Sequence, residues 1–175
     1  MTNPQAEMRQ QLMNALYHDN FSTIDELLEK DVNINLPYNH NGWTPFMWVC
    51  KEHCNPEVIA KFLKHGAKLD RVNKQGQTAL HIMAAHRSSF DCLALLIDAG
   101  ADVNAQDVQG NTPLMIAAAH PQVAMRYDVV WNLFLKSDDS VRNHEGLSAY
   151  DIAKANTAFD DEVLLMLLED SADVQ

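Results

Sequence analysis

The chain has 175 residues, of which 47% are hydrophobic, so it can bury a continuous apolar core as one compact unit or one repeat array. Its formal net charge of -11, from 24 acidic residues against 13 Lys and Arg, opposes the phosphate neutralisation on which nucleic-acid binding depends. We therefore expect neither nucleic acid nor an anionic membrane as a partner, and a neutral or basic protein surface suits the charge better.

The start, MTNPQAEMRQQLMNALYHDN, has no apolar stretch long enough for a signal peptide, and no later run approaches the ~18 residues of a membrane helix. We expect a soluble chain with the cytoplasm as its default location, although an export signal already removed would leave no trace. Cys50, Cys54 and Cys92 match no disulfide-scaffold spacing, so we interpret them as free thiols in a reducing compartment.

Four glycines recur at intervals of 34, 34 and 36 residues: Gly42, Gly76, Gly110 and Gly146. An Asn or Asp stands three residues before each glycine, at Asn39, Asn73, Asp107 and Asn143. This pattern predicts a recurring turn, in which the Asx side chain bonds the local backbone and glycine supplies a positive φ. Two residues after each glycine comes a hydroxyl and then Pro or Ala, which predicts a helix start at Thr44, Thr78, Thr112 and Ser148.

Each start leads into a short helix rich in small residues, such as LMIAAA, and then into a second helix with larger apolar residues. Examples of the second helix are PEVIAKFLKHG and FDCLALLIDAG, which we expect to end at the caps Gly66 and Gly100. One such helix pair cannot bury both of its apolar faces, so neighbouring pairs must stack.

The stretch GQTALHIMAAH followed by LLIDAGADVNAQD resembles ankyrin repeats, and the resemblance covers roughly residues 8–175. It implies an all-α solenoid of stacked antiparallel helix pairs, with hairpin-like tips that project from one edge and form a concave face. We expect one domain, 1–175, with units at approximately 5–38, 39–72, 73–106, 107–142 and 143–175. The first and last units are degenerate, as array caps are.

The fourth unit departs from the pattern by about four extra residues around PQVAMRYD, between its two helices. We expect a longer loop here with Arg126 and Tyr127 near its tip. A structural insertion is the favoured interpretation, and a partner-contact loop is the alternative because long loops in compact domains are often functional.

The histidines and cysteines raise the question of a metal site, but Cys50, His53 and Cys54 lack the second pair of ligands that structural zinc requires. His86 and His120 stack on successive first helices, and a row offers no convergent third ligand. We favour a polar contact row on a binding face, with solvated filler as the alternative. His81 holds the TPLH histidine position, to which the resemblance assigns a structural role.

No GxSxG elbow, phosphate loop or dinucleotide fingerprint occurs, so we expect no enzyme, no cofactor and no metal. Paired acids such as Asp138 and Asp139 fall at turns and helix beginnings, where solvation and the helix dipole explain them.

The resemblance implies that a protein partner contacts the tips and the exposed positions of the first helices. At the tips these positions hold His40, Asn41, Trp43, Lys74, Gln75, Gln77, Val108, Gln109, Asn111, His144, Glu145 and Leu147. On the helices they hold Lys51, Glu52, Ala85, His86, Ala119, His120, Ala155 and Asn156.

The three tryptophans receive different predictions. Trp43 lies between the turn glycine and the helix start, so we expect a binding hot spot, with packing near Tyr38 as the alternative. We expect Trp48 and Trp131 to be core residues. The acidic end, 157–175, is interpreted as a solvated cap face, with a docking edge for a basic partner as the alternative.

Three functions compete. The leading hypothesis is an adaptor that is monomeric when free and holds a protein partner on its concave face. The second is a dedicated inhibitor, of the immunity or antitoxin kind, that blocks the active site of one enzyme. An enzyme is the third, and the missing catalytic constellation argues against it.

Overall fold

A computed structural model of the chain describes residues 3–86, 89–120 and 127–156. These residues form nine helices and no strand. The helices are α1 (Pro4–Tyr17), α2 (Phe21–Glu29), α3 (Pro45–Glu52), α4 (Pro56–Lys64), α5 (Ala79–Ala85), α6 (Phe90–Asp98), α7 (Pro113–Ala119), α8 (Tyr127–Phe134) and α9 (Ala149–Ala155). Within these ranges, every helix is too short or too polar to cross a bilayer.

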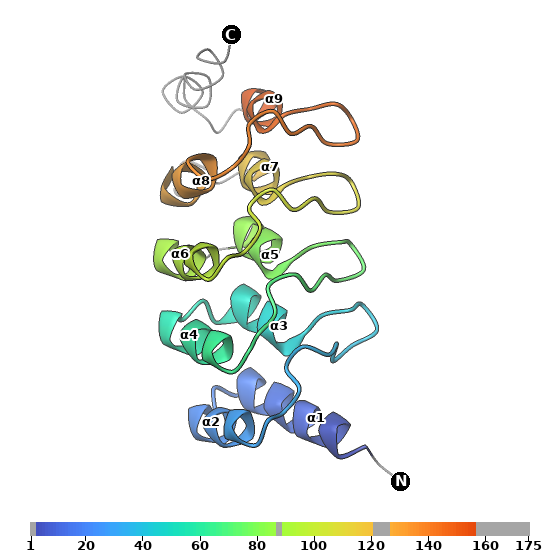
Figure 1. Cartoon of the computed structure of the whole chain (residues 1–175), viewed down its shortest axis with the longest axis vertical. Coiled ribbons are helices and arrows are strands. Elements are labelled where there is room, and N and C mark those ends of the chain that lie inside the picture. The colour runs from blue at the N-terminus through green and yellow to red at the C-terminus, as the bar shows by residue number, and fades with distance from the viewer. Residues whose placement is uncertain (1–2, 87–88, 121–126, 157–175) are drawn as a thin grey trace.

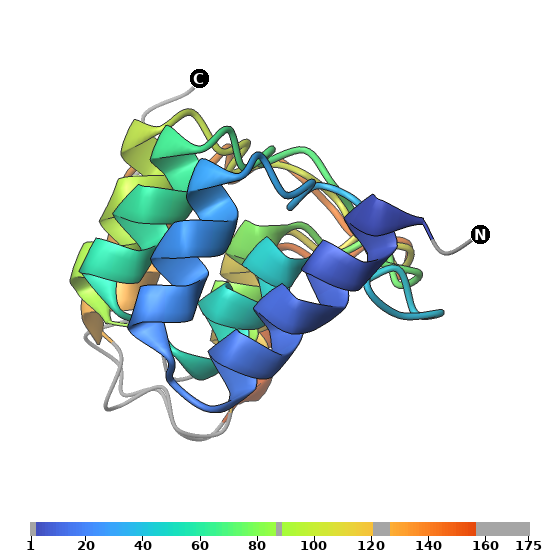
Figure 2. The ribbon, with the colours of Figure 1, turned by 90° about the horizontal axis from the view of Figure 1, so that it is seen from below.

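The helices form two columns (Figure 1). The first helices, α1, α3, α5, α7 and α9, make one column, and α2, α4, α6 and α8 make the other. From α3 onwards, each first helix is preceded by a loop that projects to the same side (Figure 1). The view along the stack shows that successive pairs lie one above another with their loops aligned (Figure 2). The chain is thus the predicted solenoid of antiparallel helix pairs.

Each tip is built by its Asx residue. The side-chain oxygen of Asn73 accepts hydrogen bonds from the backbone N–H groups of Gln75 and Gln77, at 2.9 and 3.0 Å. Asn39, Asp107 and Asn143 bond the residues two and four positions later in the same way. The predicted turn chemistry is therefore present in all four tips.

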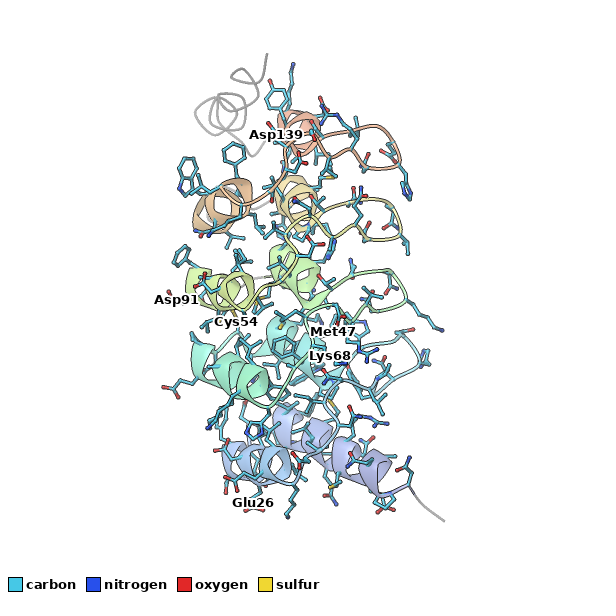
Figure 3. All side chains as sticks on the ribbon, viewed as in Figure 1. Glu26, Met47, Cys54, Lys68, Asp91 and Asp139 are labelled. Carbon is cyan, nitrogen blue, oxygen red and sulfur yellow. The ribbon has the colours of Figure 1, made fainter. Side chains whose placement is uncertain are left out.

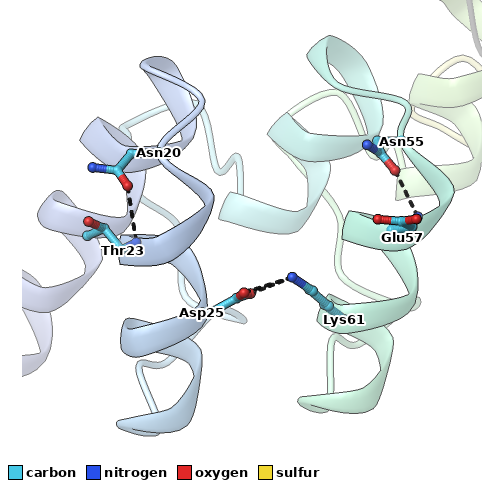
Figure 4. Close-up of polar contacts among 6 residues, drawn as sticks. All are labelled: Asn20, Thr23, Asp25, Asn55, Glu57 and Lys61. Carbon is cyan, nitrogen blue, oxygen red and sulfur yellow. Dashed lines mark hydrogen bonds and ion pairs between the residues drawn. The ribbon is translucent and has the colours of Figure 1, made fainter.

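Helix starts follow the hydroxyl pattern. The side chains of Thr44, Thr78, Thr112 and Ser148 each accept a hydrogen bond from the backbone N–H three residues later, at 3.1 to 3.5 Å. The second helices begin at polar caps as well, Asn20 bonding Thr23 and Asn55 bonding Glu57 (Figure 4). Each such cap stabilises its helix by about 1 kcal/mol.

The second helices end as predicted. After α4, Gly66 N–H donates to Leu63 C=O and Ala67 N–H to Phe62 C=O, both at 3.0 Å. Gly100 and Ala101 repeat these two bonds after α6. This pair of bonds is the Schellman motif, which satisfies carbonyls left open at the helix end.

The core runs along the stack between the two columns of helices. Phe46 of α3 and Phe62 of α4 are buried and stack with their ring centroids 5.9 Å apart. Large buried side chains such as these contribute about 1.5–3 kcal/mol each through the hydrophobic effect. The small residues Ala84 and Ala118 are fully buried where successive first helices meet, which lets those helices approach closely.

Surface ion pairs add little to the stability that this core provides. Lys61 Nζ lies 2.7 and 2.8 Å from the two carboxylate oxygens of Asp25 and so joins α4 to α2 (Figure 4). Both side chains are more than 40% exposed, at 43% and 46%. An exposed pair of this kind contributes about 0–1 kcal/mol.

Two predictions about the second helices were wrong. Trp131 is 40% exposed on α8 and is not a core residue, because Val129, Val130 and Leu133 form the buried face of that helix. Tyr127 is the first residue of α8 and not part of a loop tip, because the helix starts two residues before this buried face. Arg126 lies outside the described residues.

His81 is the structural residue that the family resemblance implied. It is fully buried, its Nδ1 accepts from the backbone N–H of Thr78 at 3.2 Å, and its Nε2 lies 3.0 Å from the carbonyl oxygen of Asn111. Because Nδ1 accepts, the ring proton resides on Nε2 and is donated to Asn111 in the next tip. Met47, Met115 and Asp151 occupy the same position in the other units, so the imidazole link is made only from α5.

Gly76 and Gly146 allow a matched test of tip packing. Both have a positive φ, +73° and +79°, where an alanine costs about 1 kcal/mol or more. A Cβ on Gly76 would lie 2.8 Å from the backbone N of Val108 in the next tip, whereas no described atom lies within 4 Å of one on Gly146. We predict that Gly76→Ala lowers the free energy of unfolding by at least ~1 kcal/mol more than Gly146→Ala does. Urea denaturation measures both, and equal losses would contradict the close approach of the tips.

Burial lowers the pKa of His81, an effect only partly opposed by its bond to the Asn111 carbonyl. Since the folded pKa lies below the unfolded value near ~6.5, the folded chain favours the neutral ring. The stabilising effect is present above that value and is lost as pH falls towards the folded pKa. We predict that stability falls more steeply between pH ~7.5 and ~5.5 in the parent than in His81→Gln, by up to ~1.4 kcal/mol per pH unit. The exposed His65→Gln is the control, and identical slopes for the parent and His81→Gln would contradict the prediction.

Candidate protein-binding surface

The four tips form a continuous row. Lys74 N–H donates to Asn41 C=O, Val108 N–H to Gln75 C=O, and His144 N–H to Gln109 C=O, each at 2.9 Å. These bonds use the backbone only. The side chains of His40, Asn41, Lys74, Gln75, Val108, Gln109, His144, Glu145 and Leu147 are all exposed. The row therefore presents side chains that differ from tip to tip on a backbone that these hydrogen bonds hold in place.

Two predicted tip residues serve the scaffold as well. Gln77 accepts a hydrogen bond from the side-chain amide of Asn73 at 3.1 Å, and Asn111 accepts one from that of Asn143 at 2.9 Å. The Asn111 bond crosses from one tip to the next. Both side chains are half-buried, so less of each is open to a partner than at the other tip positions.

Trp43 lies at the base of the first tip and is half-buried. Its backbone N–H donates to the Asn39 side chain at 3.1 Å, and its backbone carbonyl accepts from the backbone N–H of Tyr38 at 2.8 Å. The backbone of Trp43 is thus fixed while part of its ring reaches the surface. Its role as a hot spot stays a prediction.

The first helices continue the surface at their C-terminal ends. Lys51 Nζ and Glu52 Oε1 form an ion pair of 2.6 Å, with side chains 36% and 43% exposed. The equivalent residues of the other helices are small: Ala85 is half-buried, and Ala119 and Ala155 are exposed. At these positions, therefore, α3 carries charge and α5, α7 and α9 carry alanine.

The predicted histidine row is half-buried, and its last member, Asn156, joins its unit to the one before. His86 and His120 are the half-buried C-terminal caps of α5 and α7. Both form interactions within the chain. Asn156, the next member of the row, donates its side-chain amide to the carbonyls of Ala118 and His120, at 2.9 and 3.0 Å. Among the described residues, no group of three or more His, Cys, Asp or Glu side chains could hold a metal ion.

An aromatic cluster at the N-terminal end of this surface was missed by the sequence analysis. Tyr17, the last residue of α1, is 73% exposed, and its ring centroid lies 6.4 Å from that of Trp48 on α3. Trp48 packs against the core but is only half-buried, so the prediction that it is a core residue holds in part. Its other face meets His53, 4.9 Å away between centroids. Tyr17, Trp48 and His53 are called the aromatic cluster below.

The helical spacing of Trp48 could have shown that its side chain lies on the exposed face of α3. Trp48 stands three and four residues before Lys51 and Glu52, so it shares their face of α3. The equivalent positions of the later first helices hold Ile82, Ile116 and Ile152. No such indication exists for Tyr17, because the first unit has no tip glycine by which its helix positions can be aligned with those of the later units.

His53 anchors the cluster to α1. Its Nε2 lies 2.9 Å from the carbonyl oxygen of Leu16, and its Nδ1 lies 3.1 Å from a carboxylate oxygen of Asp19. Both ring nitrogens thus contact acceptors on the preceding helix pair. His53 thus lies between the Trp48 ring and the end of α1.

Known proteins share this pattern of sequence. The family described as "Ankyrin repeats (3 copies)" matches residues 12–107 and 55–144. The mouse protein "RelA-associated inhibitor" is 33% identical over 90 residues, and the human "Ankyrin repeat domain-containing protein 40" is 27% identical over 78. These matches cover 50% and 45% of this chain but only 11% and 21% of the two relatives. The chain therefore belongs to the ankyrin-repeat family, and membership implies a protein–protein interaction module.

Proposed function

We propose that this chain is a non-enzymatic adaptor that binds one protein partner through the tips and the aromatic cluster. The observation that carries this proposal is the exposure of Tyr17, at 73%, beside Trp48 on the same face as Lys51 and Glu52. Tyr and Trp are enriched among binding hot spots because each buries a large area at low entropic cost.

The contact set comprises the exposed tip side chains and the α3 residues, with the predicted His86, His120 and Arg126 as further contacts. The net charge of -11 favours a partner that is neutral or basic at the contact, since complementary charge raises association rates. We propose a monomer when free, working in the reducing cytoplasm, where Cys50, Cys54 and Cys92 are thiols until an oxidant is present. The division into five units is part of the same proposal.

An inhibitor is the second candidate. It is favoured by the name of the mouse relative, "RelA-associated inhibitor". An adaptor tethers its partner and leaves the partner's activity intact. An inhibitor abolishes that activity on stoichiometric mixing, so an assay of the captured partner separates the two.

We predict that Tyr17→Ala weakens partner binding by about 2 kcal/mol or more, as hot-spot truncations do. Its effect on thermal stability is small, because the side chain is mostly exposed. The affinity of a partner captured by the parent chain is measured by calorimetry for both proteins. Trp43→Ala, tested in parallel, examines the tip.

The matched control is Trp131→Ala, since Trp131 is 40% exposed but belongs to α8 in the other column of helices. It should bind as the parent does. Equal affinity for the parent, Tyr17→Ala and Trp43→Ala would place the contact elsewhere and defeat the proposal. Loss of affinity in Trp131→Ala alone would move the contact to the second helices.

A further inference from the structure

Two cysteines meet where the second helix pair touches the third. Cys54 follows the end of α3 with a φ of +34°, and Cys92 lies in the first turn of α6. Figure 3 shows Cys54 beside α6, the helix that carries Cys92. Cys54 is half-buried and Cys92 is fully buried. One thiol is thus open to solvent reagents and the other is shielded behind it.

Several contacts hold the two residues together. The Cys92 thiol donates to the carbonyl oxygen of Cys54 at 2.8 Å, and the N–H of Ser89 donates to the Cys54 sulfur at 3.0 Å. Ser89 also caps α6, since its hydroxyl accepts the N–H of Cys92 at 3.3 Å. A single serine therefore positions both cysteines.

The surroundings of Cys92 shift its pKa. Burial raises the pKa of Cys92 to about 12, and the neighbouring Cys54 side chain adds to this rise, whereas the hydrogen bond with Ser89 opposes it. Cys92 thus stays protonated in the reduced chain. Cys50, one turn earlier on α3, is buried, and its pKa is raised well above the usual value by desolvation.

We propose that Cys54 and Cys92 form an oxidisable dithiol, which a small disulfide such as oxidised glutathione converts into a disulfide bond between the second and third helix pairs. In the reduced state the two residues are linked only by hydrogen bonds. Oxidation replaces these with a covalent bond from the end of α3 to the start of α6.

The reaction proceeds in two thiol–disulfide exchanges. The Cys54 thiolate attacks one sulfur of oxidised glutathione, which forms a mixed disulfide and releases glutathione thiolate. Cys92 sulfur then attacks the Cys54 sulfur, and its proton passes to the glutathione thiolate that leaves. Two protein thiols are oxidised to one disulfide and one oxidised glutathione is reduced to two glutathione molecules.

The bond has a structural consequence at the proposed binding surface. Cys54 lies two residues after Glu52, so a disulfide would fix the end of α3 against α6. It would also restrict the unfolded chain between residues 54 and 92, and such a restriction raises thermal stability. We expect the oxidised chain to melt at least about 5 °C above the reduced chain.

The test incubates the full chain with oxidised glutathione and measures its intact mass without reductant. The parent should lose two hydrogen atoms and carry no glutathione, and dithiothreitol should reverse the change. Cys92→Ser should stop at one glutathione on Cys54, because the second exchange has no attacking thiol. Cys54→Ser should show neither product, and Cys50→Ser, the matched control, should behave as the parent does.

Peptide mapping of the oxidised parent keeps the test independent of variant folding. A disulfide between Cys54 and Cys92 supports the proposal. A parent that stays reduced, that retains glutathione, or that joins Cys50 to another cysteine overturns it. Loss of two hydrogen atoms in Cys54→Ser overturns it as well.

Discussion

The close contact between successive tips is the constraint on which the stack depends. A tip donates one backbone N–H to the carbonyl of the tip before it, and a glycine leaves room for that approach at Gly42, Gly76 and Gly110. Because the bonds use backbone atoms, they set the spacing of the helix pairs whatever the tip side chains are. Repeat proteins gain stability from such nearest-neighbour contacts. The tips thus set the spacing of the array, and they also carry side chains that differ from one unit to the next.

The junctions between helix pairs use different side-chain chemistry. They are joined, in chain order, by His53 with Leu16, Ser89 with Cys54, His81 with Asn111, and Asn143 with Asn111. Only the third of these is a buried imidazole link, and only the second contains thiols. Titration and oxidation therefore act on separate junctions. Helix pairs with nearly the same backbone therefore respond differently to pH and to oxidants, because a few side chains at their junctions differ.

Sequence alone predicted the local features and failed where distant parts of the chain decide. Asn73, Gly76 and Thr78 act within a few residues of themselves, so their spacing predicted the tip and the helix start. The prediction that Trp131 is a core residue was wrong, because the neighbouring helices decide which face of α8 is buried, and hydrophobicity alone does not. The partial exposure of Trp48 was missed although its spacing places it on the same face of α3 as Lys51 and Glu52. The exposure of Tyr17 depends on where α1 ends relative to α3.

The distribution of side chains along the concave surface indicates where binding energy concentrates. Ala85, Ala119 and Ala155 offer little area or polarity, so the middle of the helix row supplies shape and not affinity. Large and charged side chains lie at the N-terminal end of the column of first helices, in the aromatic cluster with Lys51 and Glu52, and along the tip row. The first tip and the aromatic cluster both flank α3, so a partner can engage both without crossing the alanine positions of the later helices. Affinity then depends on how well the two contact regions of the partner match the separation of these two patches.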